Sequence, residues 1–195
     1  MTRIAFIRHG PTAWNERRRL QGIADVPLSA AGLDTVRRWR LPGELRDFAW
    51  VSSPLTRARQ TARLLGLDCA SEPLLREMDW GAWEGLRREE LILRYGDEFE
   101  RRAAQGLDLR PHGGESPREV RTRLAGWIEK VAAAGAPVGA VTHQGVIRAA
   151  LSLATGWEMV GKLPVRMDWA SVHLFRVNDD GGLAIETLNV SLERE

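Results

Sequence analysis

Two short apolar runs that each end in a histidine constrain this chain more than any other feature. Ile4–Ile7 leads into Arg8 and His9, and Val138–Thr142 leads into His143. Such runs are typical of strands buried on both faces of a parallel sheet. Ligands bind outside the carboxyl ends of the strands in these sheets. We therefore expect the two imidazoles to meet in one crevice, where Arg8 beside them would favour phosphate.

Predicted strands and helices alternate along the rest of the chain. A further strand is expected at Ala49–Ser52, a helix over residues 146–154, and a closing β-hairpin over residues 172–188. Three other helices are expected to begin at serine N-caps, namely Ser29, Ser53 and Ser116. This βα alternation predicts a three-layer α/β/α sandwich.

The length of 195 residues suits one α/β domain, so we expect a single domain over residues 1–195. The stretch from about 75 to 115 differs from the rest, because it is rich in Trp, Arg, Glu and Gly and its helical pieces carry many charges. We interpret it as an excursion over the crevice and call it the lid segment.

The charge pattern argues against a nucleic-acid partner. The formal net charge is only +2, and nearly all basic residues are Arg, with Lys at positions 130 and 162 alone. A nucleic-acid binder more often shows Lys/Arg clusters and a larger net charge. No signal peptide or membrane-length apolar run is present, and the single cysteine, Cys69, cannot form an intramolecular disulfide. We expect a cytoplasmic protein that contacts no membrane.

His9 is the best candidate for a nucleophile. A neutral imidazole can form a covalent intermediate that divides one difficult displacement into two easier ones. Neighbouring guanidinium groups disfavour the imidazolium and so lower the pKa of the ring. A lone histidine after a strand is more often a hydrogen-bonded core residue, but Arg8 and the matching His143 favour the functional interpretation.

Other residues could bind the anion beside His9. Arg57 stands early in the helix that follows Ser53, where helix N–H groups also attract anions. The Asn15 amide could donate to a phosphate oxygen, and backbone N–H groups from Gln144 onward could face the same anion. No third histidine or carboxylate stands at ligand spacing, so we expect no metal site.

The general acid is expected to be a carboxylate in the lid segment. Glu77, Asp79 and Glu84 are candidates, and they lie around Trp80 and Trp83. Tryptophan walls would raise the pKa of a carboxyl group by desolvation, so that it holds a proton for the leaving oxygen. Pattern reasoning alone does not choose among the three acids.

At this point several blocks resemble one family, the histidine phosphatase superfamily, whose best-known branch is cofactor-dependent phosphoglycerate mutase. Its signature is similar to residues 8–15, and the likeness continues through residues 21–32. The second and third blocks are similar to residues 52–62 and 75–85. The last two blocks of the family are similar to residues 114–116 and 142–148, and all blocks occur in the family's order. Together the blocks span about three quarters of the chain.

The resemblance implies roles for residues at matching positions. His9 would be phosphorylated, Glu77 would be the proton donor, and the phosphate pocket would be lined by Arg8, Arg57, His143, Asn15 and the backbone at Gln144. It also implies a mixed, mainly parallel sheet flanked by helices, with no metal and no cofactor. Pro11 and Gln144 depart from the residues usual at their positions, yet neither removes a member of the catalytic set.

We expect a metal-independent phosphomonoesterase whose partner is a small phosphorylated metabolite; self-association as a homodimer stays open. One alternative is a phosphoglycerate mutase, although the chain is short and lacks a long tail after the final hairpin. Another is a phosphate-binding module without activity. Short relatives act on α-ribazole phosphate, phosphoserine or sugar phosphates, and Trp80, Trp83 and the segment Arg101–Arg110 are expected to select the substrate.

Overall fold

The computed structural model describes residues 1–192 and has a mixed sheet of six strands. The strand order is β3-β2-β4-β1-β5-β6, in which the pairs among the first four are parallel and those made by β5 are antiparallel. The strands are β1 (Thr2–Arg8), β2 (Ala49–Ser52), β3 (Ala70–Ser71), β4 (Val138–Thr142), β5 (Ser171–Val177) and β6 (Leu183–Ser191).

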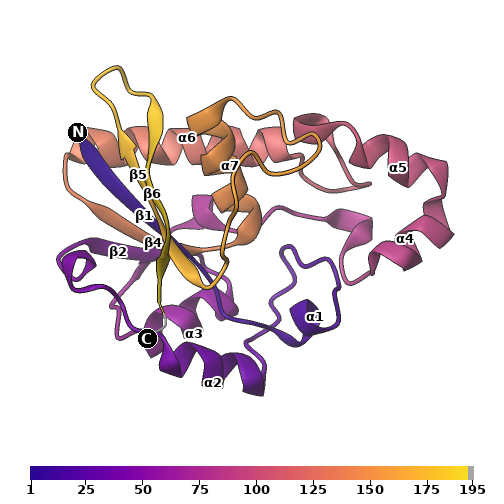
Figure 1. Cartoon of the computed structure of the whole chain (residues 1–195). Helices are drawn as coiled ribbons and strands as arrows, with labels where there is room; N and C mark the ends of the chain where they lie inside the picture. The colour runs from indigo at the N-terminus through magenta and orange to yellow at the C-terminus, as the bar shows by residue number, and fades with distance from the viewer. Residues whose placement is uncertain (193–195) are drawn as a thin grey trace.

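Helices cover both faces of this sheet, so the predicted three-layer α/β sandwich is confirmed (Figure 1). One face packs against α6 (Pro117–Ala134) and α7 (Gln144–Thr155), and the other packs against α2 (Ala30–Arg38) and α3 (Thr56–Leu64). The remaining helices are α1 (Ala13–Glu16), α4 (Arg88–Tyr95) and α5 (Asp97–Ala103), with short 3-10 turns at Gly43–Leu45, Pro73–Leu75, Gly81–Trp83 and Gly106–Asp108.

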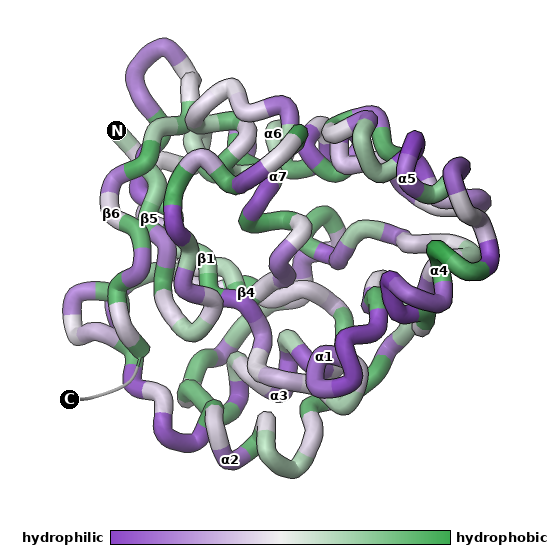
Figure 2. Tube along the Cα trace, turned by 45° about the vertical axis from the view of Figure 1, so that its right-hand side comes forward, coloured by the Kyte–Doolittle hydropathy of each residue, from purple (hydrophilic) through white to green (hydrophobic). Residues whose placement is uncertain are grey.

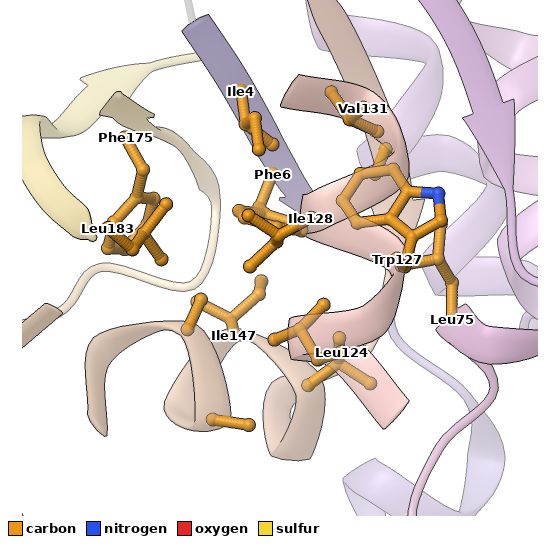
Figure 3. Packing of buried hydrophobic residues seen from close by; sticks show 14 of the residues in the cluster. Ile4, Phe6, Leu75, Leu124, Trp127, Ile128, Val131, Ile147, Phe175 and Leu183 are labelled. Atoms are coloured by element: carbon orange, nitrogen blue, oxygen red, sulfur yellow. The ribbon is translucent and has the colours of Figure 1, made fainter. Parts of the chain in front are cut away.

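The first apolar run is buried on both faces, as its composition predicts. Ile4 and Phe6 pack with residues of α6 and α7, including Ile128 and Ile147 (Figure 3). Ala5 and Ile7, which point to the other face, belong to the hydrophobic cluster beneath α2 and α3. Because every side chain of this run is fully buried, β1 is fixed between two hydrophobic layers.

The adjacency of β1 and β4 brings the two strand-end histidines together. The two strands are parallel neighbours in a register that pairs Arg8 with Thr142. The backbone N–H of His9 then donates to the carbonyl of Thr142 at 2.9 Å, which continues the ladder one residue further. His9 and His143 therefore leave the same edge of the sheet side by side, as the sequence predicts.

Two of the three predicted N-caps are confirmed, and one is wrong. The hydroxyl groups of Ser29 and Ser116 accept from backbone N–H groups in the first turns of α2 and α6. Ser53 does not cap α3, which begins three residues later at Thr56. The backbone N–H of Ser53 donates to the carbonyl of Val141 at 2.9 Å, so this residue still belongs to the end of the sheet.

The closing hairpin forms as predicted, but its first strand is not an outer one. β5 lies between β1 and β6, so His173 within it is fully buried. Burial lowers the pKa of this imidazole to about 4, which keeps the ring neutral. His173 therefore lies inside the sheet, because β6 covers the edge of β5.

The lid segment lies beside the sheet rather than within its layers (Figure 1). It carries α4 and α5, and its side chains form a small hydrophobic cluster of their own around Trp83, Leu91 and Phe99. The tube in Figure 2 is hydrophilic around α1, which faces this part of the chain. No helix within residues 1–192 is long and apolar enough to cross a membrane.

Candidate active site

His9 is held in one tautomer at the end of β1. Its Nδ1 lies 2.7 Å from the carbonyl oxygen of Gly10, so Nδ1 carries the hydrogen and donates. Nε2 is then left with a lone pair, and the Nε of Arg57 donates to it at 3.3 Å. Burial, followed by the charges of Arg8 and Arg57, lowers the pKa of this imidazole well below its usual value. The ring is therefore neutral.

Arg57 is fully buried and fixed by backbone carbonyls. Its Nη2 donates to the carbonyl of Gly22 at 2.7 Å, and its Nη1 donates to that of Ala24 at 3.0 Å. Burial lowers the pKa of this guanidinium to about 10, which leaves it charged at neutral pH. The Nε–H group of Arg57 donates to His9, so the charged guanidinium lies directly beside the imidazole.

Glu84 in the lid segment holds the loop that binds Arg57. Its Oε1 accepts from the backbone N–H groups of Gly22 at 2.6 Å and Ala24 at 2.8 Å. These are the two residues whose carbonyls accept from the Arg57 guanidinium. A continuous set of hydrogen bonds thus runs from Glu84 through this loop to Arg57 and His9.

His143 lies behind His9, and its ring centroid is 5.1 Å from that of His9. Its Nε2 and the hydroxyl of Ser53 are 2.7 Å apart, and that hydroxyl also accepts from the backbone N–H of Leu55. The other ring nitrogen, Nδ1, has no hydrogen-bond partner among residues 1–192. Burial and the neighbouring charges lower the pKa of His143 well below its usual value.

Glu77 presents a buried carboxylate at the start of α7. Its Oε1 accepts from the backbone N–H of Met78 at 2.8 Å, and its Oε2 accepts from that of Gly145 at 3.1 Å. Burial raises the pKa of this carboxyl, although the two N–H groups oppose the shift. A Cβ atom at position 145 would lie 2.2 Å from Glu77 Oε1, so a larger residue there would displace the Glu77 carboxyl.

A cavity of about 250 Å³ joins most of the predicted site residues. Those that line it directly are Arg8, His9, Asn15, Glu77 and Gln144. Arg57 and His143 are fully buried in contact with His9 and do not line this cavity.

Of the three candidate acids, only Glu77 lines this cavity. Asp79 accepts from the backbone N–H of Gly81 at 2.8 Å, and Glu84 holds the 22–24 loop. Asn15 uses its Oδ1 to accept from the backbone N–H of Thr12 at 3.1 Å, which leaves its amide hydrogens for another partner.

The cavity also includes residues to which the sequence assigned no role in the site, Arg19, Leu20, Gln21, Gly145 and Arg148, besides Trp80. Most of these stand in the family-like blocks, so their positions, but not their roles, could be read from the sequence. Trp83 is 1% exposed and packs in the hydrophobic cluster of the lid segment, and no residue of Arg101–Arg110 lines this cavity.

Within residues 1–192 no cluster of three His, Cys, Asp or Glu residues could hold a metal ion. The positive charge around His9 comes instead from Arg8 and Arg57, while the first N–H groups of α7 add partial positive charge. Such a combination of a neutral imidazole, fixed guanidinium groups and a protonatable carboxyl suits phosphoryl transfer.

The chain belongs to the histidine phosphatase superfamily, branch 1, whose family model matches residues 4–191. A solved structure of the mycobacterial glucosyl-3-phosphoglycerate phosphatase with VO3 superposes with a TM-score of 0.79 at 27% identity. The match covers 98% of this chain and 100% of that one. The family and the fold predicted from the sequence are thereby confirmed.

Curated relatives include both phosphatases and mutases. The uncharacterized phosphatase PhoE of Bacillus subtilis is 34% identical over 80% of this chain and 79% of its own. The 2,3-bisphosphoglycerate-dependent phosphoglycerate mutase 2 of Gloeobacter violaceus is 35% identical over 77% and 74%. A bifunctional protein of Mycobacterium tuberculosis is 33% identical over 96% of this chain, which spans only 54% of that longer protein.

The set of hydrogen bonds around Glu84 generates a prediction about anion binding. Glu84→Ala should weaken the affinity for orthovanadate about tenfold or more, equivalent to about 1.4 kcal/mol, because the 22–24 loop no longer fixes Arg57. Glu84→Gln keeps an amide oxygen as acceptor and should restore most of the affinity. Isothermal titration calorimetry measures both.

Glu89→Ala, an exposed substitution in the same lid segment, is the matched control and should bind vanadate like the unaltered protein. If Glu84→Ala binds vanadate normally, the loop does not position Arg57. If Glu84→Gln is as weak as Glu84→Ala, the effect comes from charge and not from hydrogen-bond geometry.

Proposed function

We propose that this chain hydrolyses small phosphorylated metabolites as a phosphomonoesterase, through a phosphohistidine on His9. The observation that carries the proposal is the bonding of the His9 ring: Nδ1 donates to the Gly10 carbonyl, and the unprotonated Nε2 faces the Arg57 guanidinium. The ring is therefore a neutral nucleophile, and the guanidinium beside Nε2 is a cation that a phosphoryl group would approach.

In the first step, Nε2 of His9 attacks phosphorus and the ester P–O bond breaks. Arg8 and Arg57 offset the charge on the phosphoryl oxygens. Nδ1 of His143 is unpartnered, and we assign the ring hydrogen to it, so that it donates to one of these oxygens. The Asn15 amide and the N–H groups at the start of α7, beginning at Gln144, supply further donors. Catalysis here is mainly positioning and electrostatics.

Glu77 moves the proton in both steps. Its raised pKa keeps a proton available, and this proton passes to the leaving alkoxide oxygen as the ester bond breaks. The resulting carboxylate takes a proton from water as that water attacks phosphorus. The N–P bond then breaks, which releases inorganic phosphate and returns neutral His9 and protonated Glu77.

The same set of groups would serve a phosphoglycerate mutase, in which the phosphoryl group returns to a second hydroxyl instead of to water. The likeness to the Gloeobacter enzyme favours that second candidate. The likeness to the Bacillus phosphatase and the mycobacterial phosphatase structure supports hydrolysis. A binding module without activity is disfavoured, because the buried nucleophile, cations and acid are all in place.

The role of Glu77 predicts a leaving-group dependence. Glu77→Gln should reduce kcat for alkyl phosphates about 10²- to 10⁴-fold, the usual contribution of general acid–base catalysis, and should affect aryl esters of acidic phenols much less. With the carboxyl intact, the rate should fall as the pH rises through the raised pKa of Glu77. This alkaline limb should disappear in Glu77→Gln.

The measurement is a pH–rate profile for one alkyl and one activated aryl ester, with Asp79→Asn as the matched carboxyl control. Equal losses for both esters in Glu77→Gln would deny Glu77 the acid role.

The hydrolase assignment predicts net phosphate release without a primer or a metal. Incubation with 3-phosphoglycerate and 2,3-bisphosphoglycerate in EDTA should yield inorganic phosphate and little 2-phosphoglycerate. Isomerisation that exceeds phosphate release by orders of magnitude would establish the mutase instead. Activity that is lost in EDTA and restored by Mg²⁺ would contradict a metal-free reaction.

A further inference from the structure

A second cavity of about 140 Å³ adjoins the candidate active site. It shares Trp80, Gly145 and Arg148 with the first cavity, so the two spaces meet along one wall. The rest of its lining is mainly apolar and comes from the lid segment, α6 and the chain after α7, including Met78, Ala103, Leu109, Pro117, Val120 and Met159.

The position of Glu77 connects this cavity to the proposed chemistry. The carboxyl of Glu77 accepts from the backbone N–H groups of Met78 at 2.8 Å and Gly145 at 3.1 Å. Both of these residues line the second cavity. A leaving oxygen that takes its proton from Glu77 would therefore lie close to the wall that the two cavities share, within reach of the second cavity.

The lining suits an apolar occupant. Apart from Arg148 and the indole of Trp80, the side chains of this lining carry no hydrogen-bonding group. The Arg148 guanidinium lies over the Trp157 ring, 5.3 Å from its centroid. Hydroxyl groups of a sugar would lose their hydrogen bonds to water in this space, whereas apolar carbon atoms would gain from burial.

The volume limits the size of the occupant. A protein cavity of about 150 Å³ lined by apolar side chains holds one benzene molecule. The space beside Glu77 therefore accommodates about one six-membered ring or a short alkyl chain.

We infer that the second cavity receives the leaving group of the substrate, and that the preferred substrates are phosphomonoesters of compact aliphatic or aromatic alcohols. This inference rests on the proposed phosphomonoesterase function, because it assumes that Glu77 protonates the leaving oxygen. It adds a substrate class, and it assigns Met78, Leu109 and Val120 to the selection of that class.

The first test uses a homologous series of n-alkyl phosphates from methyl to hexyl. Each added methylene should raise kcat/KM about fourfold, the equivalent of about 0.8 kcal/mol, until the cavity is filled. Cyclohexylmethyl phosphate should be preferred at least tenfold over glucose 6-phosphate, although both release a primary alkoxide. A flat series, or a preference for the sugar phosphate, would overturn the inference.

Two variants change the size of the cavity in opposite directions. Ala103→Leu fills it and should make the series level off at a shorter chain, while Leu109→Ala enlarges it and should move the plateau to a longer chain. Leu93→Ala, which removes a side chain that is 90% exposed on α4, is the control and should leave the series unchanged. Thermal unfolding establishes that each variant is folded.

Failure of this inference is distinguishable from failure of the proposed function. If every ester releases phosphate at similar rates in a His9-dependent reaction, the function stands and the apolar preference is wrong. If no ester releases phosphate, the proposed function itself is wrong. If Leu109→Ala fails to fold, the alkyl series with the unaltered protein still tests the apolar substrate preference.

Discussion

The contact between Arg57 and His9 is the interaction on which the rest of the site depends. A guanidinium that is removed from water loses several kcal/mol of solvation, and no carboxylate within residues 1–192 forms an ion pair with it to offset that loss. Two backbone carbonyls accept from it instead, at Gly22 and Ala24. Its Nε–H donates to an imidazole that is itself held neutral. The charge is thus left without an anionic partner, at the position where phosphate would provide one.

The fold supplies the rigidity that this arrangement requires. β1 lies between two hydrophobic layers, and its hydrogen bonding continues through the N–H of His9 to the neighbouring strand. The His9 backbone cannot shift without disturbing the core on both faces of the sheet. The 22–24 loop belongs to none of the hydrophobic clusters, and the lid segment fixes it through the Glu84 carboxylate. The lid segment therefore orders the loop that holds Arg57, and it also forms part of the cavity wall.

The sequence predicted the parts of this site that depend on local patterns. Buried strands can be recognised from their apolar composition. The two apolar runs therefore predicted that His9 and His143 lie close together. The choice of Glu77 among three acids came from family resemblance, since desolvation and N–H contacts at Gly145 depend on tertiary packing. The local sequence around Ser53 suits a helix N-cap. In the structure its backbone N–H instead donates to Val141 at the end of the sheet, and α3 begins later. Trp83 was expected at the cavity, yet its ring completes the small core of the lid segment.

The identity of the phosphorylated atom tests the central claim most directly. The protein is mixed with substrate and quenched in alkaline denaturant within milliseconds, and the phosphorylated peptide is analysed by NMR spectroscopy to determine which imidazole nitrogen carries phosphorus. The hydrogen bond from Nδ1 to the Gly10 carbonyl predicts phosphate on Nε2 of His9. Phosphate on Nδ1, on another residue, or on no residue during steady turnover would contradict the account.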